Sequence, residues 1–321
     1  MLASAVAFGF LPIFARLAYS GGAGIWGLLF VRFSTAFVLL GAILAARGRI
    51  SVPGRGKLAT LLLLGAAGYF LQSTLYFTAL LYAPVSVVAL ILYTYPVFVT
   101  ASSLSLGFER PSVRILIALV AAMSGLVLVA DPVMEGSATG VLLALGASIV
   151  YTIYIIVSTR VLKEVSGELS TFYVAGGAAV SFGIAGSLTG GLSFGWWQDA
   201  WVWAILIAVI PTVLALTFFF KGLAIVGPTR ASILSTAEIV TSVVAASAIF
   251  GEALSPLQAF GGSIIIAASL LAALKAKEPT EKLHPPAERE ASRTFNSWYR
   301  IYLIFTQYRQ ERAQLVTFRS N

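Results

Sequence analysis

The sequence lacks cysteine and has a single histidine, His284, so thiolate and imidazole chemistry is almost absent from it. Without cysteine the chain forms no disulfide, thiolate metal site or iron–sulfur cluster. His284 falls in a polar C-terminal segment, which excludes a histidine metal site or a histidine-based catalytic pair within the apolar part of the chain. We therefore expect neither a metal nor a cofactor.

Charge is also scarce. Charged residues make up 11% of the 321 residues and hydrophobic residues 59%, whereas an ordinary soluble domain carries about 25% charged residues. Such a chain cannot cover its own surface with polar groups, so we expect it to lie in a lipid bilayer. The net charge of +8 is explained by basic residues that flank membrane spans, and no nucleic-acid partner is expected.

Ten apolar segments are each long enough to cross a bilayer as a helix, which takes about 20 residues. Their apolar runs are continuous rather than alternating, which favours helices over the strands of a barrel. Glycine and proline pairs mark the breaks between them. The predicted spans cover residues 2–19, 24–46, 58–82, 84–106, 112–130, 137–159, 168–189, 200–223, 228–250 and 256–275.

Basic residues alternate along the connections between these spans. Lys or Arg residues lie in or beside the connections after spans 2, 4, 6 and 8 and in the tail, and none lies after spans 1, 3, 5, 7 and 9. The positive-inside rule therefore predicts a multi-pass protein of the cell (inner, cytoplasmic) membrane with both termini cytoplasmic. Residues 276–321 are predicted to be a disordered, basic, cytoplasmic tail.

An internal repeat links the two halves of the chain. A shift of 143 residues aligns spans 3–5 with spans 8–10 without a gap, and it pairs Glu109 with Glu252. Five spans is an odd number, so the second copy crosses the membrane in the opposite direction. Inverted repeats are typical of secondary transporters, which bind substrate near the midplane between the halves. We expect an all-α fold of two inverted five-helix repeats, 1–131 and 137–275, around a central cavity.

Several short motifs follow one another in a distinctive order. They are FGFLPIFAR at 8–16, VRF at 31–33, LYFTAL at 75–80, LYTYPV at 92–97, GPTRASILS at 227–235 followed by Glu238, and GE at 251–252. In these motifs the chain resembles the EamA-type family of the drug/metabolite transporter superfamily. The resemblance implies a ten-helix fold, a central cavity and export of metabolites or drugs by alternating access. The family often has proline after the glutamate of span 9, whereas here Ile239 follows Glu238, so that span is expected to be straighter.

Glu238 is the first candidate for substrate binding or proton coupling. It falls near the middle of span 9, where a charged side chain costs about 3 kcal/mol or more unless it is paired, protonated or hydrated. Ser235 lies on the same helical face. Either Glu238 faces a cavity as the site for a substrate ammonium group or a proton, or it forms a buried ion pair with Arg32 or Arg16 that fixes helix packing.

Arg32 in span 2 has two interpretations, as a ligand for a substrate carboxylate or as half of a structural ion pair. An unpaired Glu238 and Arg32 together would suit a zwitterion such as an amino acid. Polar and aromatic side chains of other spans are candidates for the cavity wall, with interhelical hydrogen bonding as the alternative. These candidates are Gln72, Tyr76, Tyr93 and Tyr151.

Prolines within spans 1, 4 and 8 predict kinks or hinges, because proline frees a backbone carbonyl and bends the helix. They are Pro12, Pro96 and Pro211. At the predicted cytoplasmic ends of spans 8 and 9, Lys221 and Arg230 are topology anchors or contacts of a cytoplasmic gate.

These features favour a secondary transporter that exports small metabolites (amino acids, related zwitterions or cations) or drugs, with protons as a candidate coupling ion. A uniporter or importer of a small metabolite fits the same features. An intramembrane lipid-modifying enzyme is a weaker alternative: no histidine or cysteine falls in a span, and the other carboxylates sit at span ends. The oligomeric state is left open.

Overall fold

The computed structural model describes residues 1–79, 81–83, 85–109, 112–130, 137–162, 164–251 and 253–274. All regular secondary structure in these residues is helical, and ten helical segments are long and apolar enough to cross a membrane. The predicted all-α, ten-span fold is therefore confirmed. The predicted tail at 276–321, with His284, and the repeat partner Glu252 lie outside the described residues.

Each observed span overlaps a predicted one within a few residues. In chain order the spans are built from α1 (Leu2–Gly9) and α2 (Leu11–Ser20); α3 (Ile25–Ala46); α4 (Arg55–Leu63), η1 (Leu64–Tyr69) and α5 (Phe70–Ala79); α6 (Val85–Leu92) and α7 (Tyr95–Ser105); α8 (Val113–Ala130); α9 (Ala138–Val161); α10 (Gly167–Leu188); α11 (Trp197–Ala208), η2 (Val209–Leu214) and α12 (Ala215–Val226); α13 (Pro228–Ser235) and α14 (Ala237–Phe250); and α15 (Pro256–Ala273).

Five of the ten spans are interrupted. Span 1 breaks at Phe10, span 4 at Tyr93 and Thr94, and span 9 at Thr236, while spans 3 and 8 contain the π-helical segments η1 and η2. Segments of π-helix are frequent at functional sites. The interruptions at similar places in spans 3 and 8, and in spans 4 and 9, follow the spacing of the sequence repeat.

The three prolines lie at three of these interruptions. Pro12 and Pro96 fall in the first turns of α2 and α7. N–H groups in a first turn have no acceptor within the helix, so proline breaks no helical hydrogen bond there. Pro211 lies within η2. Their action as hinges remains a prediction.

Hydroxyl groups accompany the breaks of spans 4 and 9. Thr94 donates to the Ile91 carbonyl at 2.7 Å, and Thr236 donates to the Ile233 carbonyl at 2.7 Å. Ser235, one residue earlier, donates to the Ala231 carbonyl at 2.9 Å. Such bonds compete with the backbone ladder and bend helices. Span 9 is thus interrupted without the proline that the family often has.

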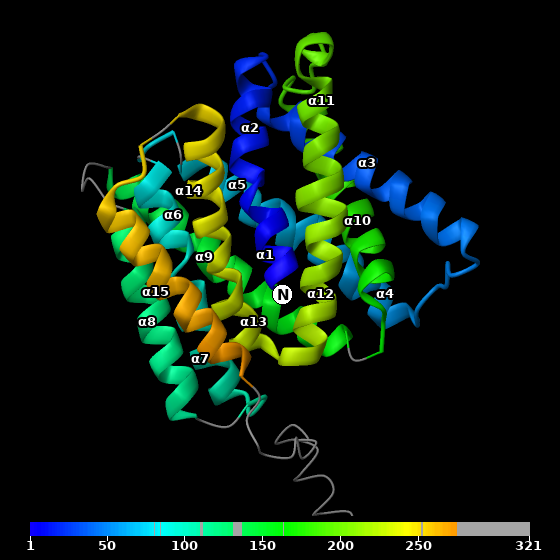
Figure 1. The fold of residues 1–321 in the computed structure, drawn as a ribbon. Coiled ribbons are helices and arrows are strands. Elements are labelled where there is room, and N and C mark those ends of the chain that lie inside the picture. Colours follow the sequence, from blue (N-terminus) through cyan, green and yellow to red (C-terminus); the bar gives the residue numbers. More distant parts are fainter. Residues whose placement is uncertain are drawn as a thin grey trace, which may run out of the picture.

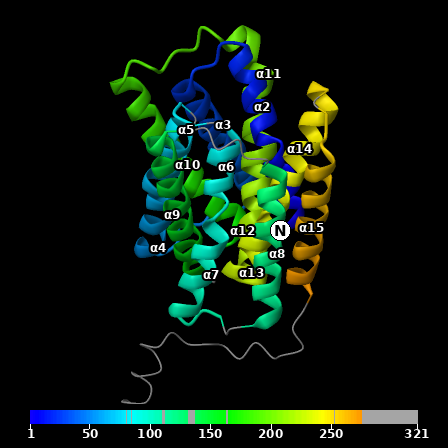
Figure 2. The same cartoon turned by 90° about the vertical axis from the view of Figure 1, so that its left-hand side faces the viewer.

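Figures 1 and 2 show the helices as one upright bundle, with α8 and α15 side by side at one edge and α3 and α10 together away from them. Small residues allow the close contacts. A methyl group added to Gly125 of α8 would lie 2.7 Å from the Gly261 carbonyl oxygen of α15, so the two backbones meet directly.

The bundle has two ends. We call the end where spans 2, 4, 6 and 8 finish the basic end, and the end where spans 1, 3, 5, 7 and 9 finish the opposite end. In Figure 1, α7 and α13 lie low, towards the basic end, and α2, α11 and α14 reach up to the opposite end. At the basic end α7 packs against both α13 and α9.

Candidate functional site

A cavity of about 770 Å³ lies in the centre of the bundle. Its wall is formed by residues of α1, α2, α3, η1, α5, α8, α9, α14 and α15 and by those around the break of span 4. The exposed residues Arg16, Ala253 and Leu254 line its mouth at the opposite end. Within the described residues none of its lining comes from α12 or α13. The cavity therefore opens at the opposite end and stops above the basic end.

Glu238 lies in the cavity wall just beyond the break of span 9. Because the helix restarts at Ala237, Glu238 occupies the first turn of α14. A helix N-terminus carries a partial positive charge that stabilises a carboxylate. The break thus supplies a local reason why this span tolerates a carboxylate deep in the bundle.

The break of span 4 places aromatic side chains beside this carboxylate. Tyr93 lines the cavity, and its hydroxyl group is the hydrogen-bond partner of the Glu238 carboxyl group. Tyr95, in the first turn of α7, also lines the cavity. It packs edge-on against Tyr151 of α9, with 4.7 Å between ring centroids. The carboxylate is therefore surrounded by tyrosine rings and hydroxyls.

Arg32 also lies in the cavity wall, but its side chain is held by the protein. It is 1% exposed, its Nε donates to Thr212 Oγ1 at 2.7 Å, and its Nη2 donates to the Tyr69 hydroxyl at 3.3 Å. Its guanidinium group also lies over the Phe33 ring, 4.9 Å from the centroid. Since Tyr69 ends η1 and Thr212 lies in η2, one arginine joins the π-helical segments of spans 3 and 8.

Glu238 and Arg32 do not form an ion pair in the described part of the chain, although both line the same cavity. The arginine is bound by neutral hydroxyls, and two N–H groups of the five in a guanidinium side chain are accounted for by these bonds. The guanidinium group of Arg32 and the carboxyl group of Glu238 thus face one space without a direct ion pair between them.

The remaining candidates fall into two groups. Gln72, Tyr76 and Tyr151 line the cavity, as does Pro12. Ser235 does not, since it is buried on the other side of the break of span 9. The helical periodicity that put Ser235 on the face of Glu238 does not continue through Thr236. Ser235 is instead the hydrogen-bond partner of Tyr95 and so supports the cavity wall from behind.

Sequence reasoning missed several wall residues. Tyr19 at the end of α2 and Gln258 in the first turn of α15 line the cavity near its mouth. Ser242 lines it too and donates to the Gly9 carbonyl at 2.9 Å, where α1 and α14 approach closely. Helical periodicity alone puts Ser242 on the face of Glu238, but nothing in the sequence pairs it with Gly9, 233 residues away.

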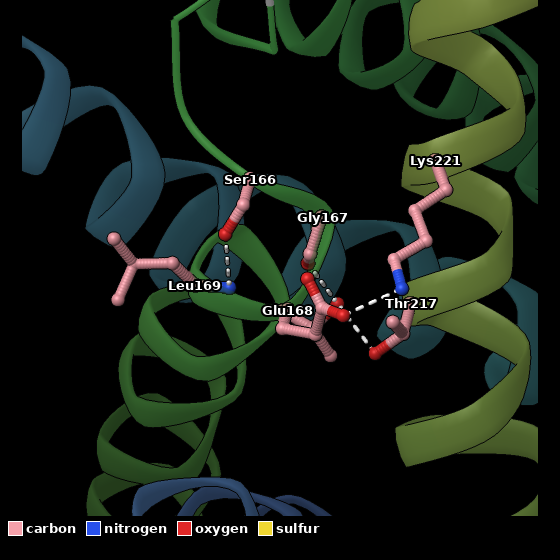
Figure 3. Close-up of polar contacts among 7 residues, drawn as sticks. Ser166, Gly167, Glu168, Leu169, Thr217 and Lys221 are labelled. Carbon is pink, nitrogen blue, oxygen red and sulfur yellow. Dashed lines mark hydrogen bonds and ion pairs between the residues drawn. The ribbon is translucent and has the colours of Figure 1, made fainter. Parts of the chain in front are cut away.

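Two kinds of polar contact close the basic end. Figure 3 shows the first, in which the Lys221 Nζ of α12 lies 2.5 Å from the Glu168 carboxylate of α10. One turn further into the bundle, Thr217 donates to Thr171 at 3.3 Å. Lys221 thus contacts a helix of its own half of the chain, an arrangement that fits an anchor better than a gate between halves.

The second contact involves Glu109, which follows α7. Glu109 Oε1 accepts a hydrogen bond from the Thr229 N–H in the first turn of α13, at 3.3 Å. Burial raises the pKa of the Glu109 carboxyl group, and the bond from the Thr229 N–H and the nearby charge of Arg230 partly offset that rise. The neighbouring Phe108 ring lies under the Arg160 guanidinium group of α9, 5.5 Å from the ring centroid.

Ten apolar spans around a cavity with charged and aromatic walls define a multi-pass membrane protein with an internal small-molecule site. The chain belongs to the EamA-like transporter family, whose model matches residues 1–130 and 138–274. It is therefore a membrane transporter and not an enzyme, and the resemblance found in the sequence motifs is confirmed.

Relatives agree with this assignment. An uncharacterized transporter of Archaeoglobus fulgidus is 34% identical over 211 residues, which cover 65% of this chain and 75% of the relative. One crystal structure of another protein matches with a TM-score of 0.71 at 19% identity, covering 84% of this chain and 94% of that chain. The structural match shows a shared fold alone.

Proposed function

We propose that this transporter exports a small metabolite by alternating access, with Glu238 as the central binding or coupling group. The observation that carries the proposal is a cavity that opens at one end of the bundle, contains a carboxylate surrounded by tyrosines, and is closed beneath by packed helices. A substrate released from such a cavity leaves through the opposite end. The two halves, 1–131 and 137–275, would act as inverted repeats that rock around this site.

The chemistry of the wall favours a substrate that carries a cationic amine. Glu238 offers a carboxylate, and the tyrosine rings beside it offer faces that attract cations. The unpaired charge of Arg32 in the same cavity offers a partner for a carboxylate. Amino acids and related zwitterions match both groups, and cationic drugs match the first group only.

We place the basic end in the cytoplasm of a cell membrane, because cytoplasmic loops carry the excess of Lys and Arg. Both termini are then cytoplasmic and the cavity mouth faces outward. Protons are the coupling ion that the site suits, since Glu238 is a titratable group within the cavity. Pro12, Pro96 and Pro211 lie where spans 1, 4 and 8 are interrupted, and they are our candidates for the hinges of the rocking motion.

The test is an export experiment in a bacterial host. Cells expressing the wild type, Glu238→Gln or the matched control Glu168→Gln are grown in parallel, and untargeted mass spectrometry compares their media. A metabolite that accumulates with the wild type and the control, but not with Glu238→Gln, supports the proposal and identifies the substrate. Equal export by all three variants contradicts the role of Glu238. If wild-type cells instead deplete a solute from the medium, the chain is an importer.

Arg32 is tested by the same assay with two substrate types. Arg32→Lys, which keeps the charge but not the two-pronged geometry, should reduce export of carboxylate-bearing substrates more than export of purely cationic ones. An equal loss of both types shows that Arg32 acts only through the structure of the wall.

A further inference from the structure

We propose that Glu109 is the latch of a gate at the basic end: it holds α13 while the cavity is open at the opposite end and releases it when the basic end opens. The proposal rests on alternating access as the proposed function. It goes beyond that function by naming the residue that releases and the helix interface that opens. We call this interface, where α7 packs against α13 and α9, the seam.

The latch is a carboxylate on a helix N-terminus. The first N–H groups of α13 have no partner within the helix, and the N-terminus carries a partial positive charge. Glu109 Oε1 accepts a hydrogen bond from the Thr229 N–H at 3.3 Å. Gly227, which precedes α13, has a φ of +81°, and a methyl group added there would collide with the same Oε1. Glycine is required here for its backbone conformation and for the room it leaves to Glu109.

The contact joins the two halves of the chain. Glu109 follows α7 in the first half, and α13 belongs to the second half. The adjacent Phe108 contacts Arg160 at the end of α9. Two consecutive residues therefore hold the end of span 6 and the start of span 9 against the end of span 4. We call Phe108, Glu109, Arg160, Gly227 and Thr229 the clasp.

Other charged contacts at the basic end differ from the clasp. Glu168 and Lys221 both belong to the second half, so their ion pair is unaffected when the halves part. Lys57 and Glu164 do join the halves, but their side chains are 39% and 62% exposed. Exposed pairs contribute little because water and salt screen them. Glu109, by contrast, is half-buried against the seam.

The seam beside the clasp contains buried polar atoms that the closed arrangement leaves without partners. The hydroxyl oxygens of Ser103 on α7 and Ser158 on α9 are buried and have no hydrogen-bond partner among the described residues. The Ser103 carbonyl accepts the N–H of Phe108 at 2.9 Å, so this hydroxyl lies one turn from the clasp. A buried hydroxyl without a partner is unfavourable, and opening the seam to water would satisfy it. The seam thus favours opening unless the clasp holds it.

The chain lacks cysteine, so a single cysteine reports on the seam without background. The reporter is Ser103→Cys, reacted with a membrane-impermeant maleimide in inside-out and right-side-out vesicles. It is placed in four backgrounds: wild type, Glu109→Ala, Glu109→Gln and Glu168→Ala. Glu109→Gln keeps an oxygen acceptor for the Thr229 N–H, and Glu168→Ala removes a carboxylate at the same end that does not join the halves.

We expect Glu109→Ala to speed labelling from the basic end by about tenfold, the effect of removing one hydrogen bond and leaving the Thr229 N–H without its partner. Glu109→Gln and Glu168→Ala should label no faster than the wild type. Unchanged labelling in Glu109→Ala, or equally fast labelling in Glu168→Ala, overturns the proposal.

A second variant approaches the clasp from the other partner. Gly227→Ala places a methyl group on Glu109 Oε1 and should speed labelling as Glu109→Ala does. Its control, Gly56→Ala, adds a methyl group where nothing lies within 4 Å. Gel filtration identifies any variant that does not fold, and the other substitution then decides the outcome.

The labelling experiment needs no substrate, so it separates the two proposals. If the wild type exports a metabolite but labelling does not respond to Glu109→Ala, only the latch is wrong. If labelling responds but no metabolite is moved, the gate stands and the proposed substrate class is wrong.

Discussion

Spans 4 and 9 each behave differently on the two sides of their breaks. Towards the basic end, α7 and α13 pack directly against each other. Towards the opposite end, the residues around the break of span 4 and those of α14 face each other across the cavity. The same two spans therefore close one end of the bundle and line an open space at the other. At the breaks, at Thr94 and Thr236, the two spans stop packing against each other and begin to line the cavity.

This difference shows why the polar groups sit where they do. At the closed end, polar contacts such as Glu109 with Thr229 connect helices to helices. At the level of the breaks, Glu238 and Arg32 face the cavity and are not paired with each other. In our proposals, polar side chains at the closed end hold the conformation, and those at the cavity bind the substrate. The predictions below test this division, starting with the largest expected effect.

Glu238→Gln should lower the initial rate of export by about 30-fold or more, because removing one partner of a buried charged contact costs about 2 kcal/mol or more. Tyr93→Phe keeps the ring and removes only the hydroxyl that contacts Glu238, so about a tenfold loss is expected. Transport by reconstituted vesicles loaded with the identified metabolite measures both. A larger loss in Tyr93→Phe than in Glu238→Gln would show that the carboxylate is not the central group.

Arg32→Met should lower the free energy of unfolding by about 2 kcal/mol, since it removes hydrogen bonds to the Thr212 and Tyr69 hydroxyls in a buried site. Arg160→Met is the matched control, because Arg160 is exposed and its contact with Phe108 contributes about 1 kcal/mol or less. Thermal unfolding in one detergent compares the two. Equal melting temperatures would mean that Arg32 does not join the π-helical segments as described.

Acidity at the basic end should affect the seam through Glu109. Burial raises the pKa of this carboxyl group in the closed conformation, so that conformation binds a proton more tightly than one in which the group is hydrated. Lowering the pH towards the raised pKa should therefore stabilise the closed seam, and raising the pH should weaken it. Arg230 on α13 opposes the effect, and the Arg160 charge lies nearby.

The expected change is about two- to threefold in the labelling rate of Ser103→Cys between pH 7 and pH 5, equivalent to a fraction of a pKa unit. The same reporter in Glu109→Gln corrects for the reactivity of the thiol itself. A ratio between the two backgrounds that stays constant with pH argues against titration of Glu109.

The smallest effect is expected at the exposed pair of Lys57 and Glu164. Lys57→Ala should change the free energy of unfolding by less than about 1 kcal/mol and leave labelling of Ser103→Cys unchanged. Thermal unfolding and the vesicle assay measure this. A strong effect would place part of the closing contact at the surface rather than at the clasp.

Much of the fold was predictable because hydropathy over about 20 residues reports burial in lipid directly. The breaks were predictable only where proline marks them, as at Pro96. In η1 the Ala66 carbonyl accepts a hydrogen bond from Ser181 of α10, 115 positions away, which the sequence does not reveal. At the break of span 9, Thr236 bonds to a nearby carbonyl, and hydropathy does not record such bonds either. That is also why Ser235 was placed on the wrong side of its helix.

The cavity itself was predicted less completely than the fold. Glu238 could be identified because a carboxylate in an apolar span is unusual. The partners of Arg32 could not, since Thr212 and Tyr69 are neutral residues 180 and 37 positions away. The same holds for Glu109, whose contact with Thr229 spans 120 positions. The sequence repeat made Glu109 conspicuous, but only the packing of α7 against α13 gives it a role.

The most direct test of the difference between the two ends is a pair of single cysteines in the wild-type chain. Ser247→Cys lies in the cavity wall near its mouth, and Ser103→Cys lies in the closed seam. Without substrate, a membrane-impermeant maleimide should label Ser247→Cys from the opposite end at least about tenfold faster than it labels Ser103→Cys from either end. Equal labelling of the two positions, or faster labelling of Ser103→Cys from the basic end, would contradict a cavity that is open at one end and closed at the other.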